Sequence, residues 1–281
     1  MKFALQLILA IILLFHWACQ YDVKEFKSIN QKVDFKYVQL GEGERPKIGQ
    51  FLATSFVVSN EAGDTLHYVP NYPYVFQLKE TAFDSAFTTI QAGDSGVFRV
   101  KRSDFNQKFS FYQPLQKDTG LLYVYFRLNH ILEKEEVEDY KRKVLSEREI
   151  DEQLALRKYV KSLDGYLDTI QDVYRLITEI NHDGEDIKSG SEVSIAYQGK
   201  FLNGYVFEDS RNKSIVPTFT YGQEYQLIDG LHLGLSGLKS GESVKIILPS
   251  RRAFGEEGSL AGIVPPYTAV IFDVKIIKVK N

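Results

Sequence analysis

The sequence of 281 residues is poor in the groups that build disulfides, metal centres and covalent active sites. Its only cysteine is Cys19, and a lone cysteine cannot form an internal disulfide. Four of the five histidines lie beyond it, widely scattered and with no cysteine nearby, so no metal-ligand spacing is present. The chain has neither a glycine-rich phosphate loop nor a Gly-x-Ser-x-Gly nucleophile turn. Metal, nucleotide and serine-hydrolase chemistry are therefore not indicated, and no cofactor is expected.

A membrane-spanning run and a basic surface are also missing. The apolar run over residues 3–18 is interrupted only by Gln6 and His16, and it falls short of the roughly 20 residues that a spanning helix needs. The formal net charge is −3, and it becomes −4 without residues 1–18, which carry only Lys2 as a charge. No basic patch is visible, which argues against a nucleic-acid partner. The remainder, at 44% apolar and 25% charged for the whole chain, has an ordinary globular composition.

The N-terminus has the pattern of a secretory signal. Lys2 gives a basic start, the short apolar run follows, and the small Ala18 stands just before Cys19. In a bacterial lipoprotein, cleavage at such a place leaves an N-terminal cysteine that is then acylated. We expect residues 1–18 to be a lipoprotein signal peptide, Cys19 to be lipidated and residues 19–34 to be a tether. The alternative is a buried structural cysteine.

Strands and turns are predicted from residue 35 to residue 132. Residues 51–58 are rich in strand formers, and residues 97–100 and 122–128 alternate as half-buried strands do. A charged stretch without glycine or proline follows, from Glu133 to about Leu163, and has a partial apolar stripe at helical spacing. We expect residues 133–165 to be a solvated helical linker. A dimerising coiled coil is the alternative, although the stripe is too irregular for sustained heptads.

The C-terminal part contains a series of short motifs in which aromatic and branched apolar residues alternate with turn residues. They are Tyr197-Gln198-Gly199, Val206-Phe207-Glu208-Asp209-Ser210, Leu227-Ile228-Asp229-Gly230, Ala253-Phe254-Gly255, Gly262-Ile263-Val264-Pro265-Pro266 and Ala269-Val270-Ile271-Phe272-Asp273-Val274. By the order and spacing of these motifs, residues 166–281 resemble an FKBP-type peptidyl-prolyl cis-trans isomerase domain. The resemblance implies an α+β fold in which a small antiparallel sheet lines a dry pocket.

A weaker similarity links residues 35–132 to this domain. Lys47-Ile48-Gly49-Gln50 parallels Lys188-Ser189-Gly190-Ser191, Gly93 to Phe98 parallels Gly241 to Ile246, and Val124 to Leu128 parallels Val270 to Val274. Leu66 stands near the place of Phe207, and the Ile-Pro-Pro turn is missing. We therefore expect two FKBP-like antiparallel domains with a short helix each, the first of them degenerate, keeping the sheet and lacking the pocket.

The resemblance also implies the roles of individual residues. Taken singly, each ring would be assigned to a hydrophobic core, and only their joint order indicates a site. Leu231 replaces a Trp, Phe254 a Tyr and Glu208 an Asp that the family commonly has, and the N–H of Ile228 would hold the substrate carbonyl. The implied catalytic residues are Tyr197, Phe207, Glu208, Ile228, Phe254 and Phe272, and the implied substrate-binding residues are Phe219, Leu227, Leu231, Ile263 and Val264.

Prolyl isomerisation needs little besides such a pocket. Rotation about the peptide bond sacrifices amide resonance over a barrier of about 18–20 kcal/mol, and removing water from the amide lowers that barrier. The predicted function is isomerisation of X-Pro bonds in polypeptide clients during protein folding in a bacterial cell envelope, at the outer membrane or periplasmic face, where the lipid would hold the protein. The alternative, which Leu231 and Phe254 favour, is a non-catalytic module that binds proline-containing segments or assembles a surface or motility complex.

Overall fold

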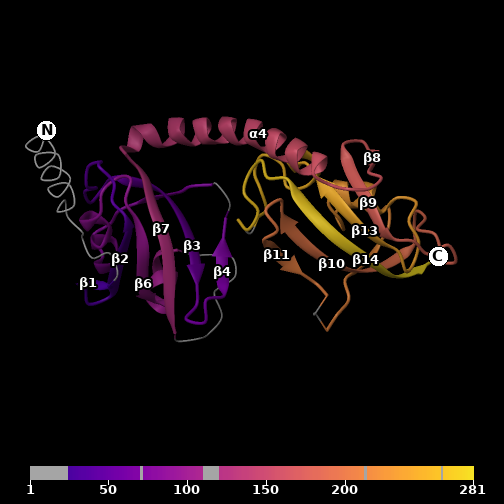
Figure 1. The fold of residues 1–281 in the computed structure, drawn as a ribbon, viewed down its shortest axis with the longest axis horizontal. Helices are drawn as coiled ribbons and strands as arrows, with labels where there is room; N and C mark the ends of the chain where they lie inside the picture. The colour runs from indigo at the N-terminus through magenta and orange to yellow at the C-terminus, as the bar shows by residue number, and fades with distance from the viewer. Residues whose placement is uncertain (1–24, 70–71, 110–119, 212–213, 261) are drawn as a thin grey trace, which may run out of the picture. The chain divides into compact units, whose positions relative to one another are not determined.

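The computed structural model describes residues 25–69, 72–109, 120–211, 214–260 and 262–281. The chain divides into two compact units, residues 1–137 and 138–281 (Figure 1). Each unit contains one antiparallel sheet together with helices, so the expected α+β fold class is confirmed. Among the described residues no helix is both long and apolar enough to cross a membrane.

The first unit is built on a seven-stranded sheet in the order β1-β2-β6-β7-β3-β4, with β5 also pairing β3. Its longest strand, β7 (Leu121–Leu132), buries every second side chain from Leu122 to Leu128, as the alternating sequence predicted. These side chains join an aromatic-rich core. The other elements are β1 (Lys27–Asn30), β2 (Val33–Gln39), β3 (Phe51–Ser59), β4 (Thr65–Tyr68), β5 (Tyr74–Gln77), α2 (Ala82–Ser85), η1 (Phe87–Thr89), β6 (Ser95–Lys101), α3 (Arg102–Lys108) and η2 (Lys134–Glu136).

The second unit repeats this topology. Its sheet (Figure 1) has the order β11-β10-β14-β13-β9-β8, and β12 also pairs β10. By this order each strand has a counterpart in the first unit. The helix α4 begins at the junction of the two units and spans 25 residues. The elements are α4 (Val137–Lys161), β8 (Asp168–Ile170), β9 (Val173–Glu179), β10 (Glu192–Phe201), β11 (Val206–Asp209), β12 (Thr218–Thr220), α5 (Asp229–Leu235), β13 (Ser243–Leu248), η3 (Ser250–Arg252) and β14 (Val270–Lys280).

One hydrogen-bond pattern fixes the correspondence between the two sheets. The N–H of Gly93 donates to the carbonyl of Leu128, and in the second unit the N–H of Gly241 donates to the carbonyl of Ile276. Next to this point β7 and β14 each contain a bulge, with Asn129 and Ile277 as the extra residues opposite β3 and β10. Counting along the strands from there matches Phe126 with Val274. The expected match of Phe126 with Phe272 is therefore wrong by two residues.

The sheet of the second unit is covered on both faces. A side chain on Gly234 of α5 would meet Ile246, which places α5 against one face of β13. Ile247, next along the strand, points to the opposite face and packs with Leu156 of α4. Leu156 is 8% exposed. The expectation of a solvated linker is corrected, because α4 contributes part of its length to the core of the second unit.

Candidate functional site

The candidate site is built around strand β10, which lies between β11 and β14. Tyr197 and Gly199 are two residues apart and therefore point to the same face of the sheet. In the adjacent strand β14, Phe272 lies directly opposite Gly199. On the other side, the short strand β11 places Glu208 opposite Gly199, and a register shift follows between Glu208 and Val206. The shift occurs at Phe207, so a local irregularity positions this ring at the sheet edge.

Three aromatic rings converge at this place. The Tyr197 and Phe272 rings meet edge to face at 5.9 Å between centroids, and the Phe207 and Phe272 rings do so at 6.1 Å and 90°. The Phe201 ring packs against the Phe207 ring, with 5.0 Å between their centroids. Phe272 is buried, whereas Tyr197 and Phe207 keep part of their surface exposed. The predicted convergence of Tyr197, Phe207 and Phe272 is therefore present in the structure.

Gly199 is a determinant of this cluster that the resemblance did not single out. A Cβ atom at this position would lie 2.7 Å from the Phe207 ring and 3.2 Å from the Phe272 ring. Real Cβ atoms do not approach other atoms to the first of these distances, so a side chain here would displace Phe207. Because Gly199 has no side chain, the space above its backbone is occupied by the Phe207 and Phe272 rings.

Ile228 provides a backbone donor at the N-terminus of α5. It is the N-cap residue, with extended backbone angles, and its carbonyl accepts hydrogen bonds from the N–H groups of Leu231 and His232. Within the described ranges the N–H of Ile228 itself donates no hydrogen bond. A free N–H at a helix N-terminus is suited to a carbonyl oxygen. Leu227 beside it is half-buried, and Leu231 points into the core at 6% exposure.

The remaining predicted residues lie on neighbouring segments. Phe219 of β12 is buried opposite Val193 of β10. Phe254 and Ile263 are half-buried, and Val264 is buried, all on the connection between η3 and β14. The ring contacts found in the described part of the chain include neither Phe219 nor Phe254 with the three converging rings. Their roles stay predictions.

The two neighbouring carboxylates of β11 have different surroundings. Asp209 accepts hydrogen bonds from Gln198 at 2.8 Å and from the Arg211 guanidinium at 2.7 Å and 3.0 Å. The Arg211 side chain holds the pKa of Asp209 far below its usual range. Because Gln198 points away from the face of Tyr197 and Gly199, Asp209 is turned from the rings. Glu208, opposite Gly199, is the carboxylate of this pair on the ring side.

The first unit lacks this aromatic arrangement for an identifiable reason. The strand correspondence places Phe56 at Tyr197, Leu66 at Phe207, Val58 at Gly199 and Val124 at Phe272. Val58 and Val124 are fully buried in the core. The valine side chain fills the space that Gly199 leaves open, and two of the three rings are replaced by aliphatic groups.

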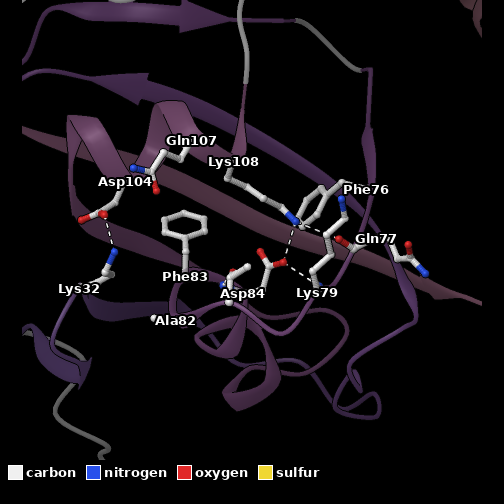
Figure 2. A pocket seen from close by; sticks show the side chains of 11 residues that line it. Lys32, Phe76, Gln77, Lys79, Ala82, Phe83, Asp84, Asp104, Gln107 and Lys108 are labelled. Atoms are coloured by element: carbon white, nitrogen blue, oxygen red, sulfur yellow. Dashed lines mark hydrogen bonds and ion pairs between the residues drawn. The ribbon is translucent and has the colours of Figure 1, made fainter.

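The first unit has a different cavity, of about 540 Å³, lined by β5, by α2 with the segment that leads into it, and by α3. Figure 2 shows Lys108 reaching over the Phe76 ring, 4.7 Å from its centroid, to the buried carboxylate of Asp84 at 2.9 Å. Lys32 and Asp104 form a second ion pair, at 2.8 Å. This cavity combines these two ion pairs with the rings of Phe76 and Phe83, unlike the cluster of three aromatic rings in the second unit.

Two further predictions fall on other parts of the chain. Cys19, the predicted lipidation site, lies outside the described residues. A metal site has no support among the residues that the structure describes, since no three His, Cys, Asp or Glu side chains are grouped suitably there.

Comparison with known proteins adds the family context. Residues 184–277 match the profile of the family described as FKBP-type peptidyl-prolyl cis-trans isomerase. An FK506-binding protein of Neisseria meningitidis serogroup B is 33% identical over 96 residues, which cover 34% of this chain and 86% of that protein. The peptidyl-prolyl cis-trans isomerase FPR2 of Saccharomyces cerevisiae is 34% identical over 93 residues, covering 33% of this chain and 67% of the relative.

A solved structure is also similar. The crystal structure of a peptidyl-prolyl cis-trans isomerase from Pseudomonas syringae pv. tomato aligns with 48% of this chain and 96% of its own, at 20% identity and a TM-score of 0.42.

Proposed function

The chain belongs to the FKBP-type peptidyl-prolyl cis-trans isomerase family, and we propose that its second unit isomerises X-Pro bonds in polypeptide clients by desolvating and twisting the prolyl amide between aromatic rings. The observation that carries this mechanism is the convergence of Tyr197, Phe207 and Phe272 around the bare backbone of Gly199.

The chemistry follows from the nature of the barrier. Isomerisation breaks no bond, and the cost of about 18–20 kcal/mol is the loss of amide resonance on rotation. Water stabilises the planar, charge-separated resonance form of the amide. Rings that exclude water from the prolyl amide weaken this stabilisation, and surfaces that fit the twisted amide better than either planar isomer lower the barrier further. The N–H of Ile228, which donates no hydrogen bond to any described residue, supplies a donor for the carbonyl of the bound peptide.

Phe207 is the most suitable residue for testing this mechanism. Its ring is only half-buried and lies on the short strand β11, so its removal affects folding less than removal of a core ring. We expect Phe207→Ala to lower kcat/KM for an X-Pro peptide by at least about tenfold, as loss of a transition-state contact does. Leu66→Ala is the matched control, because Leu66 holds the equivalent place in the first unit. Equal turnover in both variants and wild type would refute the aromatic mechanism.

We propose in addition that the protein acts in a bacterial cell envelope, held there by lipid on Cys19. The support is the order of a basic start, a short apolar run, Ala18 and the single cysteine at the N-terminus. Folding in such a compartment is slowed by uncatalysed X-Pro isomerisation over tens of seconds, so a tethered isomerase would act on a rate-limiting step. Metabolic labelling with a fatty-acid analogue should mark the wild type and spare Cys19→Ser. Equal labelling of both would refute lipidation at this residue.

The second candidate is a non-catalytic module that binds proline-containing segments. Leu231 supports it, because a buried aliphatic group replaces the flat aromatic floor that the resemblance associates with high activity. Binding of an X-Pro peptide by the wild type without any acceleration of its isomerisation would favour this function over catalysis.

A further inference from the structure

The connection from η3 to β14 carries Phe254, Ile263 and Val264, three of the residues expected around the bound prolyl ring. It has no strand or helix in its described part, residues 253–260 and 262–269. Without a strand ladder or a helix, such a segment depends on its other contacts to keep a fixed position. The source of those contacts is therefore relevant to the site.

Arg148 of α4 holds the end of this connection that leads into β14. Its Nε donates to the carbonyl oxygen of Pro266 at 2.9 Å, and its Nη2 donates to Oγ1 of Thr268 at 2.6 Å. Arg148 is 9% exposed, which is unusual for a guanidinium on a charged helix. Buried charged donors with two good acceptors are stronger and more directional than surface contacts. Arg148 therefore binds this end of the connection through two hydrogen bonds.

The residue between these two acceptors is conformationally demanding. Tyr267 has a φ of 47°, in the left-handed region that a residue with a Cβ atom seldom adopts. Its N–H donates to the carbonyl of Gly255, 3.0 Å away, and so closes the connection on itself. Strained backbone of this kind persists where surrounding contacts over-determine it. The hydrogen bonds from Arg148 to Pro266 and Thr268, on either side of Tyr267, are such contacts.

Glu152, one helical turn after Arg148, holds the other end. Its carboxylate accepts a hydrogen bond from the N–H of Ser250 and another, at 2.6 Å, from the Ser250 hydroxyl. Ser250 is the first residue of η3 and is buried. Its carbonyl in turn accepts the N–H groups of Ala253 and Gly255, each at 2.8 Å. Glu152 therefore holds Ser250, and Ser250 in turn binds Ala253 and Gly255, the residues on either side of Phe254.

A further contact joins the same segment to the donor at α5. Arg252, the last residue of η3, donates to Asp229 at 2.6 Å. Asp229 follows Ile228, whose N–H is the expected donor to the substrate carbonyl. The apolar contacts of Leu156 with Ile247, Ala269 and Ile271 keep α4 itself against the sheet.

We infer that Arg148 and Glu152 of α4 are positioning residues of the prolyl site, which hold the η3–β14 connection from its two ends. This inference rests on the proposed function and adds to it that α4 is part of the catalytic unit. The two residues do not touch the substrate. They act through Phe254, Ile263 and Val264, and through Arg252 on the helix start at Ile228.

The test uses the full chain and two measurements on the same variants. In Arg148→Ala we expect kcat/KM for an X-Pro peptide to fall by about tenfold, because misplacing a binding group by about 1 Å costs a factor of this order or more. Amide hydrogen exchange of Gly255 and Tyr267 should accelerate by a similar factor, while exchange of the β10–β14 ladder stays unchanged. Arg142→Ala is the matched control, because this arginine of α4 is 78% exposed and should change neither measurement.

Two more variants separate positioning from general loss of stability. Arg148→Lys, which keeps the charge and reaches one acceptor, should recover part of the activity and carries the test if Arg148→Ala does not fold. Glu152→Ala combined with Arg148→Ala should lower kcat/KM little more than the stronger single variant, since both act on one segment.

The outcomes are distinct. Unchanged exchange at Gly255 and Tyr267 in Arg148→Ala would overturn the inference alone. Faster exchange with kcat/KM within twofold of wild type would also overturn it, because the position of the connection would then not matter for turnover. A wild-type protein without turnover would overturn the proposed function together with the catalytic part of this inference.

Discussion

Gly199 lies directly opposite Phe272 in the β10–β14 ladder, and a methyl group on Gly199 would come within 3.2 Å of that ring and within 2.7 Å of Phe207. The glycine therefore leaves the space in which the Phe207 and Phe272 rings meet edge to face over the edge of the sheet. Its counterpart in the first unit is Val58, which is fully buried and fills the equivalent space.

In Gly199→Val, the new side chain should therefore fill the space occupied by the Phe207 ring, as Val58 fills the equivalent space in the first unit. We expect kcat/KM for an X-Pro peptide to fall at least about tenfold as Phe207 is displaced. Stability should fall by about 1–3 kcal/mol, the usual cost of an inserted side chain in a packed place. Turnover kinetics and chemical denaturation measure the two effects. Ala196→Val, on the opposite face of the same strand, is the control, and equal losses in both variants would contradict the assigned role of Gly199.

The ion pair between Lys108 and Asp84 should stabilise the first unit. The Asp84 side chain is completely buried, and its Oδ2 accepts hydrogen bonds from Lys108 Nζ and from the N–H of Lys79. Its Oδ1 has no hydrogen-bond partner among the described residues. Lys108→Met would leave a buried charge without its cation, which costs about 3–5 kcal/mol.

Denaturant unfolding would measure this loss, with Lys141→Met as the comparison. Lys141 pairs with Glu138 in solvent, at 47% and 76% side-chain exposure, and such pairs contribute about 0–1 kcal/mol. Adding Asp84→Asn to Lys108→Met should restore part of the stability. Similar small effects of Lys108→Met and Lys141→Met would show that the buried pair does not stabilise the unit.

His67 should make the stability of the first unit depend on pH. Burial lowers the pKa of His67 to about 4, and its ring nitrogen Nε2 lies 2.6 Å from the hydroxyl of Tyr74. The unfolded chain, with a His pKa of about 6.5, binds more protons than the folded chain between these values. The contribution of the neutral histidine is therefore complete above about pH 6.5 and is lost as the pH falls toward 4, by at most about 3 kcal/mol.

The measurement for His67 is the free energy of unfolding across this pH range, in wild type and in His67→Gln. Carboxylates titrate in the same range, so the quantity of interest is the difference between the two proteins. That difference should change with pH in favour of wild type as the pH rises. Parallel curves would show that His67 does not titrate in this way.

The comparison of Phe126 and Phe272 shows what the sequence could and could not provide. Alternation predicted the strand at residues 122–128 and the buried side chains within it. A shift by two residues leaves every side chain on the same face, so alternation could not distinguish the correct match of Phe126 with Val274 from the wrong one. The bulges that fix the register have no sequence pattern that would have located them.

The charges of α4 illustrate the same limit. Arg148 and Glu152 look like any pair of surface charges four residues apart on a helix, and the stretch was therefore expected to be solvated. Their partners, Pro266, Thr268 and Ser250, are about a hundred residues away in sequence and become neighbours only in the folded unit. The three rings, which the structure brings together, lie within the segment that the resemblance covers, whereas α4 lies before the matched residues 184–277.

The most direct test of the central claim is two-dimensional exchange NMR of a short peptide with one X-Pro bond. Uncatalysed interconversion takes tens of seconds, so a mixing time of about half a second gives no cross peaks between the cis and trans signals. A small amount of wild-type protein should produce these cross peaks, and the same amount of Gly199→Val should not. Cross peaks of equal intensity with both proteins, or none with wild type, would contradict the account.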